Sequence, residues 1–190
     1  MSDLYFKIVG IGEDIEYLIH DSANTLYEAF KSKVTYDVLF KDLPTELLNP
    51  RRNQYRADMV NLWLYNRFGK ALTGTTRYLV AIVDVDAYVP GLNFVFGLAT
   101  PPLKIASVFI PRLRFMVKPR STKLIERVRK EVMHEVGHLL GLEHCSNPLC
   151  VMRFSNSIFD TDSKSWKYCR LCASKLMSVG IRVNENYILS

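Results

Sequence analysis

Along the first half of the chain, segments with the apolar pattern of a strand alternate with segments whose apolar residues recur at helical spacing. This pattern predicts a series of strands and helices. An apolar, β-rich run at 4–11 predicts a first strand, and an apolar stripe at helical spacing predicts a helix over Glu13–Phe30. The same reasoning predicts a strand at 34–40 and, after a proline-marked loop, a helix that starts near Asn53 and stops at Gly69. Arg77–Val85 is nearly all apolar, as expected for a central strand buried on both faces. This order of elements predicts an α/β sheet.

The pattern changes after Val85. A short apolar segment at 93–100, interrupted by a glycine, predicts an edge strand, and Ile105–Ile110 predicts another strand. A long amphipathic helix is expected to start near Ser121, and a last helix is expected over Ser163–Val179.

Length and composition are those of one folded domain. The chain has 190 residues, 48% of them hydrophobic and 23% charged, which suits a single globular unit over 1–190. We expect an N-terminal subdomain, 1–141, with the sheet and the long helix, and a C-terminal subdomain, 142–190.

Charge and cysteine usage limit the partners and the compartment. The net charge of +6 permits attraction to anions, but the basic residues read as solvated loops and helix ends, so we expect no nucleic-acid partner. The chain shows no signal peptide and no apolar stretch of membrane-spanning length, so no membrane partner is expected. All four cysteines lie in the last quarter at metal-site spacing, which favours a reduced, cytoplasmic location. Oligomeric state is left open.

The segment HEVGHLLGLEH places three of the four histidines within eleven residues. His134 and His138 are one helical turn apart on one face, so both can bind one metal ion. Glu135 lies about 100° further round the helix, on the flank of such an ion, where it is placed as a base and not as a ligand.

Gly141 is the expected end of this helix. If the helix continued, His144 would lie about 15 Å beyond His134 along the axis, too far to share the ion. Glycine adopts the left-handed conformation at little cost, so a break there would bring His144 back as a third ligand and leave a fourth position open. The helix face opposite His134 is apolar, whereas Arg127, Lys130 and Glu131 share the histidine side, which we expect to open on a cleft.

The cysteines follow the histidines at once. The pairs Cys145-x4-Cys150 and Cys169-x2-Cys172 have the spacing of a closed, four-thiolate structural zinc site. Two disulfides or four free buried thiols are the alternatives, and the reduced context together with the short C-x-x-C spacing disfavours both.

The motif HExxHxxGxxH resembles that of the metzincin metallopeptidases, in which a tight turn carries a methionine beneath the metal, and Met152 fits that position. The run from His134 to Cys172 resembles more specifically the archaemetzincins, whose motif continues into four cysteines. The interval from Met152 to Cys169 is one residue shorter than the family pattern, a change that a loop absorbs.

This resemblance implies a metzincin-like α/β (α+β) fold: a mixed, twisted sheet of four to five strands with an antiparallel edge strand, packed on the active-site helix, plus a small zinc-stapled C-terminal subdomain. It also implies an edge strand that pairs with an extended peptide substrate. The candidate residues for that strand are Phe94, Val95, Phe96, Gly97, Leu98 and Ala99. A strand covered by its own loops is the alternative.

The resulting expectation is a zinc metallopeptidase that binds two Zn²⁺ per chain, one catalytic and one structural, and acts on a peptide or protein. Glu135 would serve as general base and Met152 as an apolar base under the ligands. The alternative is a catalytically weak or inactive zinc-stabilised peptide-binding protein. Endopeptidase and aminopeptidase activity both stay open, with Asp84, Asp86 and Glu143 as possible partners of a substrate amine. Tyr168 is a weak candidate for assisting the oxyanion.

Overall fold

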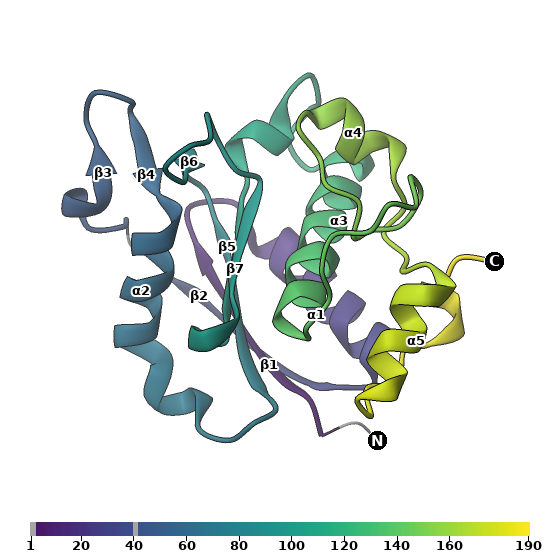
Figure 1. Cartoon of the computed structure of the whole chain (residues 1–190). Helices are drawn as coiled ribbons and strands as arrows, with labels where there is room; N and C mark the ends of the chain where they lie inside the picture. Colours follow the sequence, from purple (N-terminus) through teal and green to yellow (C-terminus); the bar gives the residue numbers. More distant parts are fainter. Residues whose placement is uncertain (1–2, 40–41) are drawn as a thin grey trace.

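A mixed five-stranded sheet forms the centre of the molecule (Figure 1). The computed structural model describes residues 3–39 and 42–190. The strands, in their order across the sheet, are β2 (Lys33–Leu39), β1 (Tyr5–Ile11), β5 (Arg77–Val83), β8 (Ile105–Phe109) and β7 (Gly97–Thr100). Neighbours from β2 to β8 are parallel, and only β7 runs antiparallel to its partner, at the edge. The mixed sheet with an antiparallel edge strand is therefore confirmed.

Helices cover both faces of this sheet. On one side lies α2 (Ala57–Phe68), and on the other lie α1 (Glu16–Phe30) and α3 (Thr122–Leu139) (Figure 1). Alternate side chains of β5 point to opposite faces of the sheet. Val80 packs in the core with α1 and α3, whereas Leu79 packs with α2. Within the described ranges, no helix combines the length and the apolarity needed to cross a bilayer.

The first helix and the second strand differ from their predicted bounds. Helix α1 begins three residues later than Glu13, because Gly12 (φ 136°) and Asp14 (φ 53°) form a turn in conformations that a helix does not use. The predicted strand 34–40 is β2, and its last predicted residue, Phe40, lies outside the described residues.

A second, small sheet was not predicted. It consists of β3 (Leu48–Asn49), β4 (Gln54–Arg56) and β6 (Ala87–Tyr88). Helix α2 consequently begins after β4 and not near Asn53, because the backbone N–H of Tyr55 donates to Asp86 O at 2.8 Å. The strand predicted over 93–100 is likewise shortened to β7, with Phe94, Val95 and Phe96 before it. Short 3-10 helices complete the chain: η1 (Thr45–Leu47), η2 (Gly69–Leu72), η3 (Pro101–Leu103), η4 (Pro111–Arg114) and η5 (Glu185–Tyr187).

The single helix predicted over Ser163–Val179 is wrong. Two helices, α4 (Ile158–Ser163) and α5 (Arg170–Ser178), flank an extended segment at 164–169. Hydrogen bonds to distant backbone hold that segment extended: Lys167 O accepts from the N–H of Val151 at 2.9 Å, and the N–H of Tyr168 donates to Tyr187 O at 3.0 Å. These tertiary bonds override the local helical pattern.

The sequence suggested that the whole polar side of α3 opens on a cleft. In the structure only part of this side does so. Arg127 is 4% exposed and donates to both carboxylate oxygens of Asp162, at 2.8 and 2.7 Å. Lys130 is 1% exposed and pairs with Glu126 at 2.8 Å. Helix α4 covers this part, so the histidine side of α3 faces a cavity only from Glu131 onward.

Candidate active site

Two histidines project from the last turns of α3 with their ring nitrogens fixed by backbone carbonyls. Nδ1 of His134 donates to Val151 O at 2.7 Å, and Nδ1 of His138 donates to Leu142 O at 2.8 Å. A carbonyl only accepts, so each Nδ1 carries the proton and each Nε2 keeps its lone pair. The two Nε2 atoms lie 3.2 Å apart.

A glycine turn brings in the third histidine. Gly141 has φ 93°, and the N–H of Leu142 closes the helix end on Gly137 O at 2.9 Å. The ring of His144 then lies 5.3 Å from that of His134 and 4.8 Å from that of His138, measured between centroids. The ligand atoms of all three lie within 4.8 Å of one another, so the chain turns where the sequence predicted.

These three imidazoles fit a zinc ion. Zn–N distances of about 2.0–2.1 Å in a tetrahedron place two nitrogens about 3.3 Å apart, close to the observed spacing. Burial, the charge of Lys164 and the neighbouring His138 hold the pKa of His134 well below its ordinary value. Burial also lowers the pKa of His138 and of His144. The rings are therefore neutral near pH 7, which is the form that binds metal.

Glu135 lies beside the histidines without joining their cluster. Its carboxyl group faces β7, where the backbone N–H of Ala99 donates to it. A Cβ on Gly97 would lie 2.5 Å from Oε1 of Glu135, so any larger residue at this point of the strand would displace the Glu135 side chain. Burial raises the pKa of Glu135 to about 8, with a further rise from Glu131 and opposing effects of Lys164 and Ala99.

A cavity of about 720 Å³ opens over these groups. The candidate edge segment forms one wall, the histidines and Glu135 form the floor, and residues after Met152 form the opposite wall. All six residues of Phe94–Ala99 line it, although only the last three belong to β7. Glu143 also lines the cavity, whereas Asp84 and Asp86 do not, because they form paired hydrogen bonds with Arg114 and Arg112.

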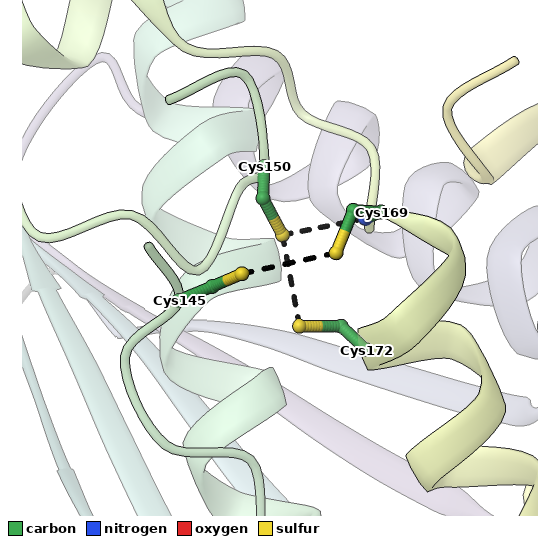
Figure 2. A group of neighbouring side chains, drawn as sticks. All are labelled: Cys145, Cys150, Cys169 and Cys172. Atoms are coloured by element: carbon green, nitrogen blue, oxygen red, sulfur yellow. Dashed lines mark hydrogen bonds between the residues drawn. The ribbon is translucent and has the colours of Figure 1, made fainter. Parts of the chain in front are cut away.

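The four cysteines converge on one point behind this floor (Figure 2). Sγ of Cys145 lies 3.8 Å from Sγ of Cys169, and Sγ of Cys150 lies 3.8 Å from Sγ of Cys172. All four thiols are free. Cys169 is the N-cap of α5 and not, as predicted, part of a longer helix.

This thiol cluster also fits a tetrahedral zinc ion. Zn–S distances of about 2.3 Å place two sulfurs about 3.8 Å apart, which is the spacing found. Burial raises the pKa of Cys150 to about 11, and burial together with Cys150 raises the pKa of Cys172. Four thiolates packed so closely together repel one another and need a cation among them.

Tyr168 is not an oxyanion group. Its side chain is fully buried and its hydroxyl donates to Met133 O at 2.7 Å, so it packs behind α3 and does not line the cavity. Met152 is fully buried next to it, and the two side chains lie against Gly137.

Sequence reasoning missed several residues of the cavity wall, among them Lys164 and Ser155. Lys164 is 2% exposed and pairs with Glu131 at 3.3 Å. The predicted long helix gave no reason to bury a lysine there. A usable signal was Glu131, a carboxylate one turn before Glu135 on the histidine side of α3, since a buried carboxylate needs a cationic partner.

Comparison with known proteins agrees with this geometry. Residues 18–178 match the family model described as Peptidase family M54. The archaemetzincin of Pyrococcus furiosus is 48% identical over 192 residues, covering 95% of each chain. That of Pyrococcus horikoshii is 58% identical over a shorter alignment of 103 residues, which covers 53% of this chain and 55% of the relative. The crystal structure of the Methanopyrus kandleri archaemetzincin superposes with a TM-score of 0.78 at 30% identity, covering 93% of this chain and 94% of the other.

The fold and the two ligand clusters define the class, a zinc metallopeptidase, which is a hydrolase acting on peptides or proteins. Within that class, the chain belongs to peptidase family M54, the archaemetzincins.

Proposed function

We propose that this metallopeptidase hydrolyses peptide bonds at a zinc ion held by His134, His138 and His144. The main support for this proposal is that the three imidazoles converge on one point. In His134 and His138, Nδ1 donates to a backbone carbonyl, so Nε2 is free to bind the ion. Zinc bound there supplies Lewis acidity, which polarises a peptide carbonyl and lowers the pKa of water.

Glu135 is the general base of the proposal. Its carboxyl group is buried in the same cavity, held by Ala99 and confined by Gly97, and it is not a member of the ligand cluster. The positive charge of a zinc ion at the three histidines would lower the pKa of Glu135 from about 8, so that its carboxylate form accepts a proton from the attacking water and passes that proton to the leaving amine nitrogen. Met152 packs beneath the histidines and contacts no substrate.

The four thiolates of Cys145, Cys150, Cys169 and Cys172 hold a second, structural zinc ion. Two ions are then bound per chain. The segment 142–190 has little core of its own, so this ion staples it as a subdomain against 1–141. Because Cys145 directly follows His144, the staple also fixes the third histidine.

An extended peptide pairs with the edge segment Phe94–Ala99. Strand β7 is the sheet edge, is antiparallel to β8 and borders the cavity, which is the geometry that strand addition needs. The cytoplasmic location and the expectation that neither nucleic acid nor membrane is a partner stay predictions.

The test is a Glu135→Gln variant of the zinc-loaded protein, assayed with a peptide library. Loss of a general base lowers kcat by about 10²–10⁴-fold, while zinc content and peptide affinity persist. The exposed Glu13→Gln exchange is the matched control and keeps kcat. A Glu135→Gln variant with unchanged kcat contradicts the assigned base, and a wild type that binds peptides without cleaving them supports a peptide-binding protein instead.

A further inference from the structure

One wall of the active-site cavity is polar and has no role in the chemistry described so far. Much of the cavity is apolar, with Phe94, Phe96, Leu142 and Phe154 among its lining residues. The polar wall is formed by the segment after Met152 and by the turn of α3 that precedes Glu135. It consists of Ser155, Asn156, Lys164 and Glu131.

Lys164 has an uncommitted hydrogen-bond donor. Its Nζ donates to Arg153 O at 3.1 Å and pairs with Oε1 of Glu131 at 3.3 Å. An ammonium group carries three N–H donors, and the described part of the chain supplies these two acceptors. Burying a lysine is expensive unless its donors are used, so the third N–H needs an acceptor in the cavity that Lys164 lines.

Ser155 supplies an independent second observation. Its Oγ is buried and, among residues 3–39 and 42–190, finds no hydrogen-bond partner. Orphaned buried hydroxyls are rare in folded proteins, and this one belongs to a residue that lines the same cavity.

The positive charge of Lys164 reaches the catalytic groups. Lys164 lines the same cavity as Glu135 and the three histidines, which is where the proposed function cuts a peptide. The carboxylate of Glu131 offsets this charge. The hydroxyl of Thr161 donates a further hydrogen bond to Glu131 Oε1, at 3.3 Å. The wall therefore offers directed donors more than a free charge.

We propose that Lys164 and Ser155 form a specificity subsite for a carboxylate of the bound peptide, from either an acidic side chain or a free C-terminus. A carboxylate only accepts hydrogen bonds, and charge-assisted bonds from an ammonium are the strong ones, so it satisfies both donors. The inference deepens the proposed function and rests on it, because the subsite lies in the cavity where the peptide would be cut.

The chain contains a matched control for this lysine. Lys130 is also buried, at 1% exposure, and also combines one carboxylate, Glu126, with one carbonyl, Asp162 O at 3.1 Å. It does not line the cavity. Replacing either lysine by methionine removes a buried, paired charge, but only the exchange at Lys164 removes the donor of the subsite.

The experiment measures peptide affinity by calorimetry on the zinc-loaded Glu135→Gln protein, which binds without turnover. One pair of probes is a hexapeptide blocked at both ends with a central glutamate or glutamine. The second pair is the glutamine peptide with a free C-terminal carboxylate or an amide. Each pair isolates one source of the carboxylate.

The same ratios are measured after Lys164→Met, after Glu131→Gln with Lys164→Met, and after Lys130→Met. The double variant removes both charges, so it leaves no unpaired buried carboxylate that might disturb folding.

The expected result is an affinity ratio of about tenfold in favour of the carboxylate in at least one pair of probes. That ratio falls to near one in both Lys164 variants and persists in Lys130→Met. Peptide binding with ratios near one, or a ratio that survives in the double variant, overturns the subsite. If the zinc-loaded protein binds none of the peptides, the proposed function fails together with it.

Discussion

Gly137 lies against the side chain of Met152, so closely that a Cβ on the glycine would overlap Sδ. The same Cβ would lie 3.2 Å from the ring of Tyr168. A glycine in the last turn of α3, one residue before His138, is thus explained by the close approach of Met152. The helix, the methionine and the tyrosine therefore pack closely together at Gly137.

Gly137→Ala is expected to lower the free energy of unfolding by about 1–3 kcal/mol, because overpacking pushes Met152 away from the helix. It should also weaken zinc binding at the histidines, since His138 is the next residue. Chemical denaturation and a chelator competition measure the two effects. Gly69→Ala, at the end of α2, is the control, because the three atoms nearest to its new Cβ all belong to the ring of Tyr65. Equal behaviour of the two variants would show that the methionine contact has no role.

Gly97→Ala is expected to act on turnover more than on stability. The new Cβ would lie 2.5 Å from Oε1 and 2.6 Å from Cγ of Glu135, and the side chain moves aside more easily than the strand. A displaced base lowers kcat by about tenfold or more while zinc content stays at the wild-type value. Steady-state kinetics and a zinc count check this, again with Gly69→Ala as control. Normal kcat with intact zinc would show that Glu135 is not confined by the strand.

Replacing one of the four cysteines is expected to weaken zinc binding at the histidines as well. Cys145 directly follows His144, and its N–H donates to Met152 O at 2.9 Å, so the thiol cluster and the histidine floor share backbone. Cys172→Ser should lower the Tm and also weaken zinc binding at the histidines, as measured by chelator competition. Ser174→Ala, an exposed position on the same helix, is the control. A Cys172→Ser protein that keeps the wild-type affinity at its histidines refutes this coupling.

Acid should weaken the contact between α4 and α3. The hydrogen bonds from Arg127, and after them Lys123, hold the pKa of Asp162 below its ordinary value of 3.8. A lowered pKa means that the stabilisation is fully present above pH 3.8 and is lost as the pH falls through the lowered value.

Asp162→Asn should therefore cost about 2–3 kcal/mol of unfolding free energy at pH 7, because it leaves Arg127 buried without its carboxylate. Denaturation curves of the variant and the wild type should approach each other at pH 3 and below. A difference that does not depend on pH would mean that the carboxylate charge contributes nothing.

Local sequence signals predicted what depends on local geometry. The spacing of His134 and His138 and the glycine at 141 follow from helix geometry alone, and the structure brings His144 to them. The mixed sheet, its antiparallel edge and the membership of the archaemetzincins were also predicted. Family membership follows from the short motifs, and the mixed sheet with its antiparallel edge was predicted from the resemblance that those motifs carry.

Long-range contacts decided the features that the sequence did not predict. The segment 164–169 has a helical pattern, but bonds to Val151 and Tyr187 hold it extended. Lys164 is buried only because that segment turns back onto Glu131. Likewise, α2 starts late because β4 pairs with β6, more than thirty residues away in sequence. No local pattern carries such information.

Anomalous diffraction at the zinc edge, from crystals of the zinc-loaded wild type, locates the bound ions and their ligands in one measurement. We predict two zinc sites per chain: one bound by the Nε2 atoms of His134 and His138 together with the ring of His144, the other bound by four sulfurs. A single site, imidazoles turned away from a common ion, or a thiolate among the ligands at the histidines would contradict it.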